Sequence, residues 1–122
     1  MIKGCKELIV WQKAMDLAVE VYKLVKLLPK NETYGLSDQM RRAAVSIPSN
    51  IAEGQCRYST RDYSNFLNIA RGSCFELDTQ LHICIRLEYV KESDIEKAIN
   101  LCEEVGRMLS TMIGKLRGTV KE

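Results

Sequence analysis

Apolar side chains recur at helical spacing in four segments of the chain. In residues 7–28 they occupy most of the helix circumference, and in residues 36–55, 60–87 and 94–117 they follow a spacing of three and four. No segment shows the strict alternation typical of a half-buried strand. The connections are short, which favours antiparallel neighbours. The pattern therefore predicts an all-α fold, an antiparallel up-and-down four-helix bundle, formed by one domain over residues 1–122.

Local signals place the ends of these helices. Pro29 ends the first helix, because the residue before a proline is pushed out of the helical region. Ser59 with Asp62, and Ser93 with Glu96, have the spacing of capping boxes. These two boxes are expected to open the third and fourth helices.

The second helix contains a proline inside its period. Pro48 removes one backbone hydrogen bond and presses its ring against the carbonyl of Ala44, at roughly 3 kcal/mol in a helix interior. We expect tertiary contacts to offset this cost, and Pro48→Ala to leave the fold intact. The face opposite the core is polar, and we call it the polar ridge: Gln39, Arg42, Ser46, Ser49, Asn50, Glu53 and Arg57.

Composition indicates an ordinary soluble domain, with 46% hydrophobic and 28% charged residues. No apolar run approaches the roughly 20 residues that cross a bilayer, and no secretory signal is visible, so we expect no membrane association and a cytoplasmic location. The five cysteines include no C-x-x-C pair, which argues against a disulfide framework and a zinc ribbon. Cys74, Cys84 and Cys102 fit core positions, whereas Cys5 and Cys56 are expected at the surface.

The sequence lacks the residues of common catalytic and metal sites. The one histidine, His82, has Thr79 three positions before it, so the Glu-x-x-His pairs of a di-iron bundle are missing. Motifs for phosphate loops, dinucleotides and nucleophile elbows are also missing. The adjacent Glu103 and Glu104 face different directions on a helix. We therefore expect no enzyme, no cofactor and no metal, with His82 at the helix surface.

Net charge is only +2, from 18 basic and 16 acidic side chains, which by itself supports nucleic-acid binding weakly. Between residues 36 and 74, however, every basic residue is arginine, the better ligand for phosphate and RNA. Tyr58 and Tyr63 lie beside these arginines and could stack on unpaired bases, although Tyr63 also fits the core face. Arginines that contact phosphates and an asparagine that adds polar contacts make up the candidate nucleic-acid-binding set: Arg41, Arg42, Asn50, Arg57 and Arg61.

Two other interpretations of the polar ridge remain open. In the first the ridge is structural: Ser46 and Asn50 satisfy groups freed near Pro48, while Glu53 pairs with Arg57. In the second the ridge contacts a protein partner. Separately, the first and fourth helices carry more apolar surface than one bundle core uses, which favours self-association.

Three strings carry a resemblance to a known family: VWQKAMDLAVEVY, YGLSDQMRRAAVSIPSNIAEG and FLNIARGSCFELDTQL. Over nearly the whole chain they resemble the bacterial four-helix-bundle proteins known as the 23S rRNA intervening-sequence protein family. The resemblance implies a homopentamer subunit, and some members are encoded within insertions in large-subunit rRNA genes. A similar fold serves as the accessory protein of diversity-generating retroelements, which binds nucleic acid and a reverse transcriptase.

The resemblance also identifies one departure, because the family commonly has glycine where this chain has Glu88. Together with the arginines, the family resemblance implies a non-enzymatic, oligomeric nucleic-acid-binding protein. Structured RNA is the expected ligand, and DNA is the other candidate. A homo-oligomeric scaffold that presents the ridge to a partner enzyme is the alternative. Salt-sensitive binding would favour the first function, and a nuclease-resistant protein complex the second.

Overall fold

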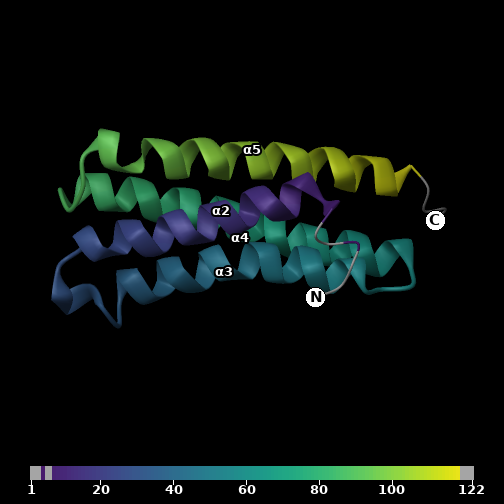
Figure 1. The fold of residues 1–122 in the computed structure, drawn as a ribbon, viewed down its shortest axis with the longest axis horizontal. Helices are drawn as coiled ribbons and strands as arrows, with labels where there is room; N and C mark the ends of the chain where they lie inside the picture. The colour runs from purple at the N-terminus through teal and green to yellow at the C-terminus, as the bar shows by residue number, and fades with distance from the viewer. Residues whose placement is uncertain (1–3, 5–6, 119–122) are drawn as a thin grey trace.

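The computed structural model describes residue 4 and residues 7–118, and within them the chain is an antiparallel bundle of four long α-helices (Figure 1). Their bounds are Ile9–Leu24 (α2), Leu36–Gln55 (α3), Thr60–Arg86 (α4) and Glu92–Arg117 (α5). Each helix packs on its neighbours in sequence, and α2 also packs on α5, which closes the bundle. The predicted all-α, up-and-down four-helix fold is confirmed.

The core is a continuous cluster of apolar side chains from all four helices. On α2 the buried positions repeat at intervals of four and three, which is the spacing that keeps side chains on one helix face: Val10, Ala14, Leu17, Val21 and Leu24. The other helices show the same spacing over their buried residues. Hydrophobic periodicity therefore positions the helices, as the sequence indicates.

Three of the five cysteines belong to this core, as predicted: Cys74, Cys84 and Cys102 are buried. Burial raises the pKa of Cys84 to about 11, with a smaller contribution from the charge of Glu32. A hydrogen bond with Cys74 and burial raise the pKa of Cys102. The thiols of Cys84 and Cys102 therefore stay protonated at neutral pH and behave as small apolar side chains. Cys56 is exposed, as expected, whereas Cys5 lies outside the described residues.

The first helix is shorter than the predicted 7–28. After Leu24 the chain forms a 3-10 turn at Val25–Leu27 and a second one at Lys30–Glu32. Leu28, which precedes Pro29, has φ −77° and ψ 152°, an extended conformation that relieves the clash with the proline ring. The proline therefore stops the helix through the residue before it.

The two predicted capping boxes have different outcomes. Ser59 caps α4, because its hydroxyl accepts a hydrogen bond from the backbone N–H of Asp62 at 3.0 Å. The Ser93 box is wrong: α5 begins two residues earlier, and Ser93 lies in its first turn. The Asp94 carboxylate instead accepts a hydrogen bond from the backbone N–H of Lys91 at 2.9 Å, which makes Lys91 the N-cap.

The proline-containing helix is continuous, and Pro48 lies buried inside α3. Near it, the seam with α4 is polar: the hydroxyls of Ser46 and Ser73 lie 2.8 Å apart. The Asn50 amide donates to the Ser46 carbonyl at 2.8 Å and to its hydroxyl at 2.9 Å. Polar contacts therefore join the two helices next to the residue that interrupts the backbone ladder.

The turn after α4 contains a backbone conformation that side chains disfavour. Glu88 has φ 62°, in the left-handed region where glycine has no steric penalty. This is the position at which the family resemblance implies glycine. The departure from the family pattern therefore changes the side chain while the turn keeps a glycine-like backbone.

Apolar exposure follows the sequence prediction only in part. On α2 several large apolar side chains reach solvent, among them Met15 at 41%, Val19 at 54% and Tyr22 at 47% exposure. The expectation for the fourth helix is wrong, because the apolar side chains outside the buried stripe of α5 pack against the core. Exposed apolar side chains lie instead on α4, where Phe75 is 66% exposed. Across the part of the chain that the structure describes, no helix combines the length and the hydropathy that crossing a membrane requires.

Candidate nucleic-acid interface

Two of the predicted site residues lie near the start of α3. Arg41 donates from Nη2 to the carbonyl oxygen of Thr33 at 3.0 Å. Arg42 donates from Nε to Oδ2 of Asp38 at 2.9 Å, and this hydrogen bond and charge raise the pKa of the Arg42 guanidinium. The Arg42 side chain is 79% exposed. Both guanidiniums are held locally, and Arg42 still presents most of its surface to solvent.

Two more of these residues lie at the opposite end of the bundle. Arg57 follows α3 and pairs with Glu53 at 3.2 Å, while its guanidinium lies 4.6 Å from the centre of the Phe66 ring. Arg61 is exposed in the first turn of α4, and no ion pair is found for it among residues 7–118. Tyr58, between them, is fully exposed, whereas Tyr63 packs partly against the core. Of the two tyrosines, Tyr58 has its ring free of the core for stacking.

The predicted residues therefore form two groups and not one site. Arg42 lies in α3 and Arg57 lies two residues past its end, so the 15 residues between them, at about 1.5 Å per residue, separate the two by roughly 22 Å along the helix axis. Asn50 lies between the groups, with its amide directed to Ser46. The structure places Arg41 and Arg42 near the start of α3 and places Arg57 and Arg61 around the turn between α3 and α4, with roughly 22 Å of helix between the pairs.

The contacts named by the structural interpretation of the polar ridge are present. Ser46 bonds Asn50, and Glu53 pairs with Arg57. The interpretation is wrong in one detail. The carbonyl group that the proline ring presses against is that of Ala44, whereas the Asn50 amide donates its hydrogen bond to the carbonyl of Ser46. Part of the ridge therefore stabilises the α3–α4 seam, whatever else it contacts.

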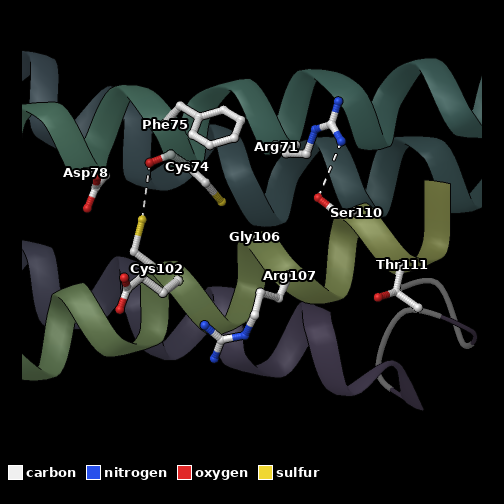
Figure 2. Close-up of a pocket in the computed structure, with 10 residues that line it drawn as sticks. Arg71, Cys74, Phe75, Asp78, Cys102, Gly106, Arg107, Ser110 and Thr111 are labelled. Carbon is white, nitrogen blue, oxygen red and sulfur yellow. Dashed lines mark hydrogen bonds between the residues drawn. The ribbon is translucent and has the colours of Figure 1, made fainter. Parts of the chain in front are cut away.

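A groove that the sequence did not predict lies between α4 and α5 (Figure 2). Its volume is about 590 Å³, within the range of small-ligand sites. Arg71 and Phe75 line it from α4, and Gly106, Arg107 and Ser110 line it from α5. The sequence did contain a signal for Phe75, because this large apolar residue lies beside the buried stripe of α4 and not within it. Which α5 residues face it depends on helix register, which periodicity alone does not give.

The described residues contain no group of three or more histidine, cysteine or acidic side chains that could hold a metal ion. His82 is exposed on α4, as predicted, and its Nδ1 lies 2.8 Å from the carbonyl oxygen of Asp78. His82 does not line the groove that contains Phe75; it lines a separate hollow between α4 and the start of α5.

The fold and these surfaces define an all-α bundle whose candidate site is a set of arginines and a solvent-open groove. The model of the 23S rRNA-intervening sequence protein family matches residues 6–111, and the chain belongs to this family. It is similar to the crystal structure of a protein of unknown function from the S23 ribosomal protein family of Bacteroides thetaiotaomicron VPI-5482. The TM-score is 0.80 at 31% identity, over 87% of this chain and 96% of that one. No curated protein matches the chain. Neither description names an enzymatic activity.

Proposed function

We propose that this protein is a non-enzymatic, oligomeric nucleic-acid-binding protein whose ligand is structured RNA. The observation that carries the proposal is the spacing of the arginine groups along α3, roughly 22 Å apart. A single small anion cannot contact both groups, whereas a folded nucleic acid presents phosphates over such a distance. The description of the family, which refers to 23S rRNA, supports RNA over DNA.

Within this proposal the residues have different roles. Arg41, Arg42, Arg57 and Arg61 contact phosphates, and Asn50 contributes a polar contact between them. Phosphate contacts fix position and supply affinity without reading sequence. Binding should therefore be salt-dependent and tolerant of RNA sequence.

Self-association is part of the proposal, with a pentamer as the assembly that the family resemblance implies. Beside the buried stripe of α2, and starting at its N-cap, apolar side chains repeat at intervals of three and four, a spacing that suits packing against another helix: Leu8, Trp11, Met15, Ala18 and Tyr22. These side chains are half-buried or exposed in the isolated subunit. A second copy of the chain would cover them. Assembly would also raise affinity, because several weak sites on one particle act at high effective concentration.

The test is fluorescence anisotropy with a labelled, structured RNA at about 50 and 200 mM salt, using nuclease-treated protein. Replacing the four arginines with glutamine should reduce affinity for all RNA sequences alike and flatten the salt slope. The matched control replaces four exposed cations of α4 and α5 with glutamine, namely Arg86, Lys97, Lys115 and Arg117, and should change affinity much less. Equal loss in both variants would mean that net charge, and not this set of arginines, determines binding.

A protein-interaction scaffold is the second candidate, and one observation favours it. Arg42 and Arg57 are each paired with a carboxylate of their own helix, Asp38 and Glu53, so the surface carries mixed charge. Mixed charge suits a protein partner better than a polyanion. This function predicts a partner enzyme that remains bound in pull-downs after nuclease treatment, and no RNA binding at low salt.

Two further expectations belong to this proposal. We place the protein in the cytoplasm, because its described cysteines are free thiols and a reducing compartment keeps them so. We assign it no catalytic activity, because the two cysteines that line the groove, Cys74 and Cys102, are buried, and a hydrogen bond and burial raise the pKa of Cys102 away from that of a nucleophilic thiolate.

A further inference from the structure

The groove between α4 and α5 has charge of opposite sign at its two ends (Figure 2). Arg71, Ser110 and Thr111 lie at one end, and Asp78 and Cys102 lie at the other, with Phe75 and Gly106 between them. Glu103, which also lines the groove, follows Cys102 in sequence. A ligand that fits this arrangement carries an anionic group, a flat apolar centre and a hydrogen-bond donor, in that order.

The arginine end has positive charge that no described carboxylate neutralises. Arg71 donates from Nη1 to the Ser110 hydroxyl at 3.3 Å and from Nη2 to the Asn68 side-chain oxygen at 3.2 Å. Both acceptors are neutral, so they fix the guanidinium without cancelling its charge. Within residues 7–118 Arg71 forms no ion pair. Arg107, on the facing helix, lies nearer the middle of the groove, and its guanidinium points away from α4 (Figure 2). The arginine end of the groove can therefore bind an anion such as a phosphate.

The centre of the groove is open and apolar. Phe75 is 66% exposed, so most of the surface of its side chain is available to a ligand. A Cβ atom added to Gly106 would meet no heavy atom within 4 Å, so the facing helix leaves the ring accessible. The buried thiols of Cys74 and Cys102 line the groove beneath it. An exposed ring with open space beside it is a surface on which a nucleobase can stack.

The carboxylate end selects among bases. Asp78 and Glu103 accept hydrogen bonds and repel phosphate, so they favour a base edge that carries N–H donors. Adenine, guanine and cytosine have an exocyclic amino group, and uracil does not.

We propose that the α4–α5 groove binds one unpaired nucleotide of an RNA, with its phosphate at Arg71, its base on Phe75, and an exocyclic amino group toward Asp78 and Glu103. This inference rests on the proposed RNA-binding function and adds to it a base-discriminating subsite separate from the arginines of α3. The groove thus supplies a preference among bases that phosphate contacts cannot supply.

The experiment compares labelled ten-nucleotide adenosine and uridine oligomers by anisotropy, next to the structured RNA. The wild-type protein should bind the adenosine oligomer about tenfold more tightly than the uridine oligomer. Phe75→Leu keeps the apolar volume, removes the ring, and should abolish this preference. The control is Tyr34→Leu, which removes an aromatic ring that is 94% exposed at the other end of the bundle and should leave the preference unchanged.

Each outcome separates the subsite from the function on which it rests. If the structured RNA binds in a salt-dependent way but adenosine and uridine oligomers bind equally, the groove is not a nucleotide subsite and the proposed function still holds. The same conclusion follows if Phe75→Leu keeps the wild-type preference. If no RNA binds at about 50 mM salt, the proposed function fails and this inference fails with it.

Discussion

Helix α4 packs against α3 on one side and against α5 on the other, and the two seams differ. The α3 seam is tight: Ser46 and Ser73 meet at 2.8 Å, and a Cβ atom on Gly54 would come within 2.9 Å of the Tyr63 ring. The α5 seam opens into a groove of about 590 Å³, where a Cβ atom on Gly106 would meet nothing within 4 Å. Small residues therefore have different effects at the two seams. Ser73 and Gly54 allow close packing against α3, whereas Gly106 leaves open space between α4 and α5.

The largest expected effect is at the tight seam. Ser73→Leu adds volume where the side chain is buried and removes its hydrogen bond to Ser46, so it should lower the free energy of unfolding by about 2–3 kcal/mol. The matched control is the preceding residue: Gly72→Leu faces open space and should leave stability unchanged or slightly higher. Chemical denaturation measures both. Similar losses in the two variants would mean that the α3 seam is no tighter than the helix surface.

A pair of glycine substitutions tests the same contrast with one methyl group. Gly106→Ala should raise the free energy of unfolding by about 1 kcal/mol, because alanine is the better helix former and the site is open. Gly54→Ala makes the same change in α3 but brings the methyl against Tyr63 and Phe66, so it should destabilise by about 1 kcal/mol. Changes of the same sign, measured by denaturation, would contradict the distinction between the seams.

The sequence predicted the bundle because apolar spacing reports directly on which face of a helix is buried. It predicted α3 at its observed bounds, 36–55, even through Pro48, and Ser59 as the cap of α4. It missed the start of α5. Lys91 has no side-chain hydrogen-bond acceptor, and the cap is defined instead by the hydrogen bond that the Lys91 backbone N–H donates to the Asp94 carboxylate.

The candidate site was less accessible to sequence reasoning. Arg41 lies near the start of α3 and Arg57 lies just past its end, a separation that charge counting ignores. Predicting the groove would have needed the register of α4 against α5, because Phe75 and Gly106 line one groove only after the two helices pack. Periodicity gives the buried face of each helix, but it does not give this axial alignment.

Pro48→Ala should have a smaller effect on the subunit. The backbone regains a hydrogen bond, while the core loses two buried methylene groups and the unfolded chain gains freedom, so stability should stay equal or rise by up to about 1 kcal/mol. If the proline serves assembly, the variant should remain folded and change its molar mass in light scattering. A clear drop in melting temperature with unchanged assembly would assign Pro48 to the stability of the subunit.

The smallest expected effect depends on pH and acts at one end of the tight seam. Glu32 accepts hydrogen bonds from the backbone N–H of Leu36 at 3.1 Å and from the Tyr89 hydroxyl at 2.8 Å, which ties the start of α3 to the turn after α4. First the Leu36 bond and then the Tyr89 bond lower the pKa of Glu32 below its ordinary value of 4.5. A carboxylate with a lowered pKa in the folded state stabilises that state above 4.5, and this stabilisation is lost as pH falls through the folded value.

Glu32→Gln should therefore be less stable than the wild type at pH 7, and the difference should shrink as pH falls from about 5 to about 3. Tyr89→Phe, which removes one of the two donors, should show the same pH dependence with a smaller amplitude. Thermal melts across this range measure both variants. A difference between Glu32→Gln and the wild type that stays constant with pH would mean that the Glu32 side chain acts through its shape and not its charge, and that the tight seam has no ionisable link at this end.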